Sequence, residues 1–168
     1  MWNDSTVYPF PNKSYMLTLH ASDSQIYDED TKNAQLVFTK QGKIVFKDSL
    51  SCMFTDIRFE DFNNDGIKDV LVFHYTGARA NPTYYLYLVI NKSHNLIRVK
   101  GFENLPNPSL DTKLNIITSV GLSGDNYYSF YRIGSNNKLV NLGHSYEENP
   151  RDSMQYNKAV RSILKEKN

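Results

Sequence analysis

The chain has 168 residues and a mass of 19.4 kDa, which fits one domain because compact domains commonly hold about 100–200 residues. Nineteen Lys and Arg oppose 18 Asp and Glu, for a formal net charge of +1. This balance lacks the basic excess expected of a nucleic-acid-binding protein. No run of about 18 apolar residues is present, so the sequence predicts no membrane span. The single cysteine, Cys52, excludes an internal disulfide and a metal site built on paired cysteines.

Aromatic residues are frequent and glycines are few. The chain holds 12 Tyr and 9 Phe but only 8 Gly, a mixture typical of pleated, half-buried strands. The sequence therefore predicts an all-β fold: a single compact domain of about ten antiparallel strands with little helix, in a propeller-like or curved sheet arrangement. Residues 14–168 are expected to form this domain, and residues 1–13 a poorly ordered N-terminal segment.

The expected strands are short runs bounded by Gly, Asn, Asp, Pro or Ser, and they cover residues 15–21, 34–39, 43–48, 54–59, 70–75, 84–90, 96–99, 114–120, 127–133 and 138–142. Residues 40–42, 91–95 and 135–137 have the length and composition of hairpin loops. Residues 84–90 are apolar on both alternating sets, which indicates a central strand covered on both faces. No repeat of about 20–50 residues is evident, which argues against a propeller of similar blades.

The C-terminal run 153–165 fits two structures. Tyr156, Val160, Ile163 and Leu164 have helical spacing, whereas Met154, Tyr156, Val160 and Leu164 share one face of a strand. We slightly favour the strand.

The most informative segment is residues 61–69, with the sequence DFNNDGIKD. Its oxygen-bearing side chains occupy loop positions 1, 3, 5 and 9, supplied by Asp61, Asn63, Asp65 and Asp69. Gly66 stands at position 6, where a sharp reversal needs positive φ, and the carbonyl of Ile67 would be a further ligand. Ca²⁺ prefers six to eight oxygen ligands, so this spacing predicts a calcium site.

This loop differs from an EF-hand, because position 12 is Val72 and both flanking segments are predicted strands. It resembles the calcium loop between two strands of integrin-type FG-GAP blades. The alternative is a polar turn that binds nothing, but three converging carboxylates without a cation would repel one another. We expect a structural role for the ion, since no histidine or catalytic group stands nearby in the sequence.

No segment predicts an enzyme. Residues 121–125 approach a nucleophile elbow, but Asp125 stands where that pattern needs Gly. The four histidines lack metal-ligand spacing. Asp56 and Glu60 with Asp61 could imitate a glycosidase carboxylate pair, yet Asp61 belongs to the calcium loop and acids on a short strand commonly face solvent.

From about residue 54 to residue 142 the chain resembles a bacterial family of lysozyme inhibitors: the periplasmic inhibitors of invertebrate-type lysozyme and the related immunity proteins against lysozyme-like toxins of secretion systems. The matching landmarks, in order, are the segments 59–69, 81–88, 105–108 and 117–119, the last running into Ser123-Gly124. A calcium loop followed by a Pro-Thr-Tyr-x-x-Tyr strand and then a Ser-Gly loop is more specific than the calcium loop alone.

The resemblance implies a compact β domain, Ca²⁺ in the 61–69 loop, a periplasmic or cell-envelope location, and a loop that plugs the active-site cleft of a lysozyme-like glycoside hydrolase or toxin. In the family a Ser-Gly-x-Tyr-like loop does this. The corresponding residues here are Ser123, Gly124, Asp125 and Tyr127, with the tyrosine one place later. An ordinary hairpin loop, with Tyr127 as a strand residue, is the alternative.

A second candidate partner surface is the segment 76–81, where Arg79 could pair with an acidic group of a cleft. The sequence thus predicts a non-enzymatic inhibitor or immunity protein whose loops occupy a peptidoglycan hydrolase. A calcium-dependent surface or adhesion module of FG-GAP type is the second hypothesis, and a hydrolase is the third.

Overall fold

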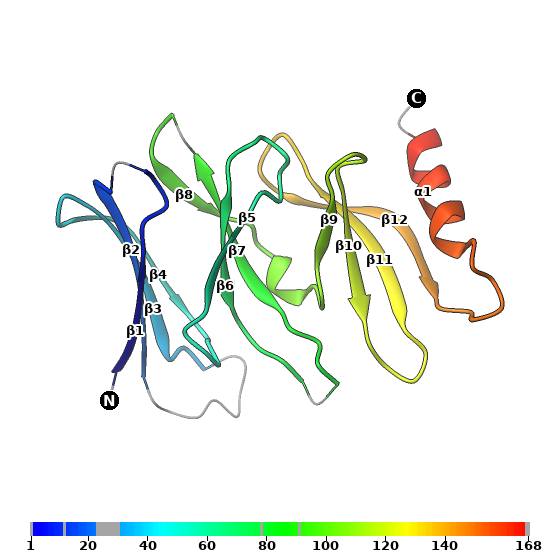
Figure 1. Ribbon diagram of the computed structural model, residues 1–168, viewed down its shortest axis with the longest axis horizontal. Coiled ribbons are helices and arrows are strands. Elements are labelled where there is room, and N and C mark those ends of the chain that lie inside the picture. The colour runs from blue at the N-terminus through cyan, green and yellow to red at the C-terminus, as the bar shows by residue number, and fades with distance from the viewer. Residues whose placement is uncertain (1, 12, 23–30, 78, 91, 167–168) are drawn as a thin grey trace.

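The computed structural model describes residues 2–11, 13–22, 31–77, 79–90 and 92–166. Over these residues the chain forms twelve strands, one α-helix and one short 3-10 helix, which confirms the predicted all-β fold with little helix. The strands form three four-stranded antiparallel sheets that lie side by side along the long axis of the molecule (Figure 1).

Each sheet is made of four strands that follow one another in the chain. The first sheet contains β1 (Trp2–Val7), β2 (Tyr15–Ser22), β3 (Ala34–Lys40) and β4 (Lys43–Leu50). The central sheet contains β5 (Ile57–Glu60), β6 (Asp69–Phe73), β7 (Tyr84–Ile90) and β8 (Asn95–Arg98). The third sheet contains β9 (Ser109–Asp111), β10 (Ile116–Gly121), β11 (Tyr127–Ile133) and β12 (Leu139–Glu147). The 3-10 helix η1 (Phe102–Asn104) connects the last two sheets.

The central sheet is buried on both faces. Tyr85, Tyr87 and Val89 of β7 pack against the first sheet, in a core that includes Leu17 and Phe38. The alternate residues of β7, Leu86 and Leu88, pack in a second core with η1 and the third sheet, together with Phe62, Phe102, Leu105 and Ile117. The prediction of a central strand over residues 84–90 is therefore confirmed, because both alternating sets of apolar side chains find a covering layer.

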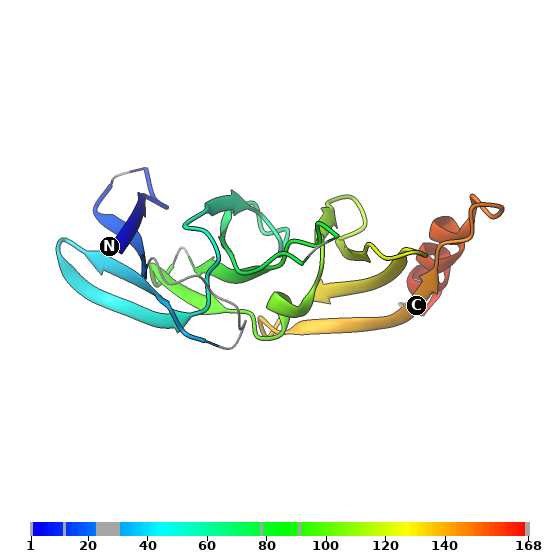
Figure 2. The same ribbon diagram turned by 90° about the horizontal axis from the view of Figure 1, so that it is seen from below.

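A helix, α1 (Gln155–Lys165), covers the outer face of the third sheet at one end of the row (Figure 2). Val160 and Ile163 pack there against Ile116 and Phe130. The preference for a strand over residues 153–165 is wrong. The strand pattern counted Met154 and left out Ile163, but Met154 is exposed and Ile163 is buried, so the helical set is the one that finds a surface to bury against.

The N-terminus also differs from expectation. Residues 2–7, predicted to be poorly ordered, form β1, which pairs with β2 from Trp2↔Ser22 to Val7↔Leu17. Backbone pairing to an existing edge needs no apolar alternation, so the sequence carries little signal for this strand. The three consecutive four-stranded sheets are a structural repetition for which the sequence shows no matching repeat.

The chain reverses at both ends of β6, so the loop that precedes this strand and the loop that follows it lie at its opposite ends. The hairpin loops predicted at 40–42 and 135–137 connect paired strands. The strands on either side of the loop predicted at 91–95 are paired, with residue 91 outside the described residues. The loop 61–68 precedes β6 and lies at the upper edge of the molecule in Figure 1, whereas the loop that follows β6 and the β10–β11 loop lie at the lower edge. No helix in the described ranges is long and apolar enough to span a membrane.

Burial of the central sheet leads to a stability prediction. Leu88 is fully buried and Leu164 is 36% exposed. We expect Leu88→Ala to lower the free energy of unfolding by about 3 kcal/mol, because it leaves a cavity in a close-packed core. The matched substitution Leu164→Ala should cost about 0.5 kcal/mol or less. Urea unfolding followed by tyrosine fluorescence measures both, and equal losses would contradict the two-sided burial.

Candidate functional site

The loop 61–68 is fixed to the protein by two apolar side chains. Phe62 is buried in the core between the central and third sheets, where its ring meets that of Phe102 at 5.0 Å. Ile67 packs on the opposite side, against the core shared with the first sheet. Asn64 Nδ2 donates to the carbonyl of Thr112 at 3.0 Å, in the turn after β9. The loop is therefore held from three directions.

Within the loop, side-chain oxygens turn toward the backbone. Asp61 accepts hydrogen bonds from Asp65 N at 3.2 Å and from Gly66 N at 2.8 Å. Asn63 Oδ1 also accepts from Asp65 N at 3.2 Å, and Asp65 Oδ1 accepts from Ile67 N at 2.8 Å. Gly66 has φ of +85°, which confirms the positive φ predicted at position 6. The side chains of Asp61, Asn63 and Asp65 thus gather around one tight reversal.

Asp69 differs from the other predicted ligands because it is completely buried. Its Oδ2 accepts from Phe62 N at 3.0 Å and its Oδ1 from Val89 N at 3.1 Å. Burial raises the pKa of the Asp69 carboxyl to about 6; the two backbone N–H bonds oppose this rise, and the charges of Asp65 and Asp61 add to it. The carboxylate therefore joins the loop to β7 at the point where the β6–β7 ladder ends.

The donor set of the loop has the chemistry that a hard cation needs: carboxylate, amide and backbone oxygens, with Asp61 and Asp65 near enough to raise the pKa of Asp69. No ion pair joins these three carboxylates to a Lys or Arg within the described ranges. Among the same residues, no group of three or more His, Cys, Asp or Glu side chains is arranged as a metal site. Asp69 would have to share its oxygens between an ion and two N–H groups, which a carboxylate with four lone-pair sites can do.

At the other end of β6, two loops that are distant in sequence are joined. Asn81 Oδ1 accepts a hydrogen bond from Leu122 N at 2.7 Å, and Asn81 Nδ2 donates to Leu122 O at 2.9 Å. Asn107 Nδ2 donates to Asn81 Oδ1 at 3.0 Å and to Val120 O at 2.9 Å. One asparagine therefore clamps the backbone of the β10–β11 loop as a paired strand would.

A further set of bonds fixes the segment between the two loops. Asn107 N donates to Pro82 O at 2.9 Å, and Val120 N donates to Pro106 O at 3.0 Å. Ser119 Oγ donates to the same Pro106 carbonyl at 2.9 Å. The landmark segments 81–88, 105–108 and 117–119, which the sequence presents separately, thus meet at one edge of the molecule.

The predicted partner-binding residues lie on these joined loops. Ser123, Gly124 and Asp125 are exposed in the turn between β10 and β11, where Ser123 Oγ donates to the Asp125 carbonyl. Tyr127 is the first residue of β11 and pairs with Gly121, with 46% of its side chain exposed. Arg79 is exposed in the turn two residues before Asn81. Tyr127 is therefore both a strand residue and an accessible one.

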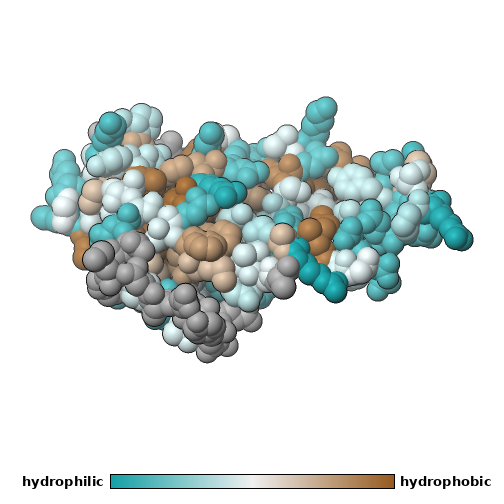
Figure 3. All heavy atoms as spheres, turned by 60° about the horizontal axis from the view of Figure 1, so that its bottom comes forward, coloured by the Kyte–Doolittle hydropathy of each residue, from teal (hydrophilic) through white to brown (hydrophobic). Residues whose placement is uncertain are grey.

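An aromatic residue that the sequence did not single out lies at the same end of the central sheet. Phe54 was predicted to begin a strand, but β5 begins at Ile57 and Phe54 is 59% exposed. Its ring contacts Phe73 at 5.4 Å, and Phe73 contacts Tyr84 at 5.6 Å. Figure 3 shows hydrophobic side chains grouped among hydrophilic ones on this face of the molecule. A strand propensity alone cannot reveal that such a phenylalanine faces solvent.

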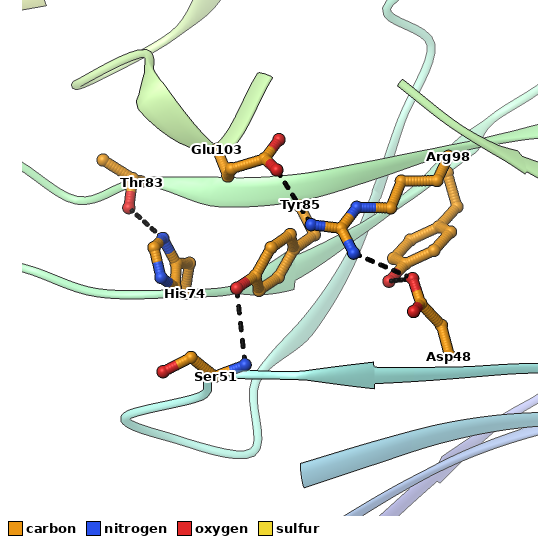
Figure 4. Close-up of polar contacts among 8 residues, drawn as sticks. Asp48, Ser51, His74, Thr83, Tyr85, Arg98 and Glu103 are labelled. Atoms are coloured by element: carbon orange, nitrogen blue, oxygen red, sulfur yellow. Dashed lines mark hydrogen bonds and ion pairs between the residues drawn. The ribbon is translucent and has the colours of Figure 1, made fainter. Parts of the chain in front are cut away.

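A polar cluster inside the molecule joins the first and central sheets (Figure 4). Arg98 donates to Asp48 Oδ2 at 3.0 Å and to Glu103 Oε1 at 2.8 Å, and its guanidinium lies 4.4 Å from the centre of the Tyr85 ring. Tyr87 also donates to Asp48 at 2.9 Å. This arrangement holds β4, β8 and η1 together and pairs three partly buried charges, although Arg98 Nε and Glu103 Oε2 have no hydrogen-bond partner among the described residues.

Beside this cluster lies a cavity of about 360 Å³, lined in part by His74, Thr83, Tyr85 and Glu103. His74 Nδ1 is 3.1 Å from Thr83 Oγ1, and its ring is 4.7 Å from that of Tyr85. The Glu103 carboxylate is paired with Arg98 at 2.8 Å. The carboxylates weighed as a glycosidase pair are separate from this cavity, with Asp56 paired to Arg58 at 2.8 Å.

Comparisons of this chain with protein-family models, with curated proteins and with solved structures find no match.

The bonds of Asp69 lead to a prediction that needs no metal. In EDTA, Asp69→Ala should lower the free energy of unfolding by about 2 kcal/mol, because it leaves the buried N–H groups of Phe62 and Val89 without an acceptor. Asp69→Asn retains one acceptor oxygen and should lose less. Asp65→Ala, in the exposed part of the loop, should cost under about 1 kcal/mol. Urea unfolding in EDTA gives the order, and a loss for Asp65→Ala as large as that for Asp69→Ala would contradict it.

Proposed function

We propose that this protein is a calcium-binding, non-enzymatic inhibitor or immunity protein that blocks the active-site cleft of a lysozyme-like peptidoglycan hydrolase. The observation that carries the proposal is the clamp made by Asn81 on the β10–β11 loop. It joins Asn81 to Leu122, so that the loop that carries Arg79 and the loop that leads into Ser123 are held side by side. A loop already fixed in place loses little conformational entropy when it enters a cleft.

The chemistry of this edge suits a carboxylate-bearing cleft. Glycoside hydrolases carry a pair of Asp or Glu residues at the scissile bond. The guanidinium of Arg79 can pair with a carboxylate through two N–H groups, and the phenol of Tyr127 can donate one hydrogen bond while its ring fills space. Phe54 supplies an exposed apolar contact at the same end. Tyr and Arg are, with Trp, the residue types enriched among strong interface contacts.

Calcium has a structural role in this proposal. Asp61, Asn63, Asp65 and Asp69, with the carbonyl of Ile67, would hold the ion. When bound, Ca²⁺ supplies positive charge to carboxylates that otherwise repel one another. The ion would tie the loop 61–68 to the start of β6. Since the target acts on the bacterial cell wall, the protein would work in the periplasm or cell envelope.

A calcium-dependent surface or adhesion module of FG-GAP type is a second candidate. The three consecutive four-stranded antiparallel sheets favour it, because propeller blades are four-stranded sheets repeated along the chain. Such a module has no reason to inhibit a wall hydrolase, so the inhibition assay below distinguishes the two.

For the metal, we expect millimolar CaCl₂ to raise the melting temperature of the EDTA-treated protein by several degrees, because the ion binds the native state and not the unfolded chain. Asp65→Ala should remove most of this shift. Asp125→Ala, which removes an exposed acid in the β10–β11 loop at the opposite edge of the molecule, should retain the shift. Differential scanning calorimetry measures all three proteins. The same melting curve in EDTA and in calcium would contradict the metal site.

For the partner, we expect an equimolar amount of the protein to stop wall lysis by at least one member of a panel of lysozymes and peptidoglycan hydrolases. Tyr127→Ala and Arg79→Ala should each weaken inhibition about tenfold or more, as loss of an interface anchor does. Lys138→Ala, which removes an exposed positive charge in the β11–β12 loop, is the control. Turbidity of a cell-wall suspension reports lysis. No inhibition of any hydrolase would favour the adhesion module, and wall cleavage by the protein itself would favour a hydrolase.

A further inference from the structure

The outer end of the third sheet contains a pocket that is part of neither the loop 61–68 nor the β10–β11 loop, which is proposed to enter the hydrolase cleft. It has a volume of about 460 Å³ and lies where β11, β12 and the start of α1 meet. Its lining consists of three tyrosines, two acids, two amides, a proline and a serine: Tyr128, Tyr146, Tyr156, Glu148, Asp152, Asn149, Gln155, Pro150 and Ser153. No Lys, Arg or His is among these lining residues.

One wall of the pocket is an aromatic stack. The rings of Tyr128 and Tyr146 lie parallel, with centres 4.8 Å apart and an interplanar angle of 10°. Tyr156, on the first turn of α1, leans against Phe130 at 5.8 Å, and Phe130 in turn contacts Tyr146 at 6.1 Å. Tyrosine rings have a negative face that attracts ammonium and guanidinium groups.

The charge of the pocket is negative, and one of its two acids carries most of that charge. Asp152 is neutralised by Lys158, whose Nζ lies 2.6 Å from Oδ2, and this bond lowers the pKa of Asp152. Glu148 has a neutral hydrogen-bond partner, the side-chain amide of Asn126. Burial raises the pKa of Tyr146 to about 12, and the charges of Tyr128 and Glu148 add to the rise. The Glu148 carboxylate lines the same pocket as the two stacked tyrosines.

Hydrogen bonds within the protein fix the rim of the pocket. Gln155 accepts a hydrogen bond from Asn149 N at 2.6 Å through Oε1, and its Nε2 donates to the carbonyl of Glu147 at 2.9 Å. Asp152 N donates to Asn149 O at 2.9 Å. These bonds close the turn between β12 and α1 around the cavity, so a ligand need not order it.

The pocket adjoins the β10–β11 loop, which is proposed to enter the hydrolase cleft. Glu148 Oε2 accepts from Asn126 Nδ2 at 2.6 Å, and Glu148 N donates to Asn126 O at 2.7 Å. Asn126 immediately precedes Tyr127. A protein that receives the loop 122–126 in its cleft would therefore hold the rim of that cleft against this pocket.

We infer that the pocket binds the guanidinium or ammonium side chain of an Arg or Lys on the rim of the partner's cleft. This inference rests on the proposed function for the identity of the partner. The anionic, tyrosine-lined cavity favours a cation over a neutral or acidic group. A hydrolase whose substrate is an anionic wall polymer is expected to carry basic side chains around its cleft, since complementary charge concentrates the substrate there.

The pocket is tested first without any partner. Two-dimensional NMR follows the backbone amides of the protein during titration with Nα-acetyl-arginine methylamide, and the neutral isostere Nα-acetyl-citrulline methylamide is the matched probe. We expect the arginine probe to shift the signals of residues around the pocket, with millimolar affinity, and the citrulline probe to bind at least fivefold more weakly. Equal binding of the two probes, or no shifts up to 100 mM of the arginine probe, would overturn the inference.

Two matched variants assign the effect to one carboxylate. Glu148→Gln should weaken binding of the arginine probe about fivefold or more, as loss of a nearby charge does. Glu147→Gln removes the same charge at the last residue of β12, on the face opposite that of Tyr146, and should leave binding unchanged. Unchanged melting temperatures show that both variants are folded. Equal effects of the two substitutions would mean that the probe senses overall charge and not the pocket.

The partner is tested with any hydrolase that the parent protein inhibits. Glu148→Gln should raise the inhibition constant about fivefold, and Glu147→Gln should not. Probe binding without inhibition of any hydrolase would retain the cation pocket and remove the proposed function. Inhibition that Glu148→Gln leaves unchanged would retain the proposed function and remove the pocket from the interface.

Discussion

The central sheet can exist only as the middle layer of three, and the remaining architecture depends on this constraint. Every residue of β6 is buried, and β7 directs apolar side chains to both of its faces. A sheet of this kind would expose one apolar face if either neighbour were missing. The first sheet, the third sheet and η1 are therefore required covers, and α1 does the same for the outer face of the third sheet. The order of the layers follows from burial alone.

This constraint explains why a charged side chain is tolerated at the start of β6. Asp69 enters the core at the position where β6 leaves the loop, and its two oxygens replace carbonyls that the ladder no longer supplies to Phe62 and Val89. A hydrophobic residue of the same size would leave both N–H groups unpaired. The acid at this position is thus explained by backbone hydrogen bonding, and the proposed role as a calcium ligand calls for the same residue.

Sequence reasoning succeeded where one local pattern has one physical solution. The two-faced apolar run of β7, the hairpin loops and the positive φ of Gly66 are cases of this kind. It failed where the outcome depends on a distant surface. α1 is a helix because the third sheet offers an apolar face to Val160 and Ile163. Phe54 is exposed because β5 starts later than its propensity predicts. The clamp of Asn81 joins residues separated by 41 positions, and no single-sequence pattern records such a contact.

The two ends of β6 separate the two proposed roles of the protein. The loop 61–68 is held by Phe62, Ile67 and Asp69 at one end, whereas the loops of the proposed partner surface are held at the other end by the bonds of Asn81 and Asn107. None of these latter bonds involves a residue of the loop 61–68. An ion at 61–69 would therefore act on the proposed partner surface through the central sheet that both ends share and through the third sheet, to which the bond from Asn64 to Thr112 joins the loop. A stable scaffold with independently fixed loops is what a rigid plug requires, because its contacts must be in place before the partner arrives.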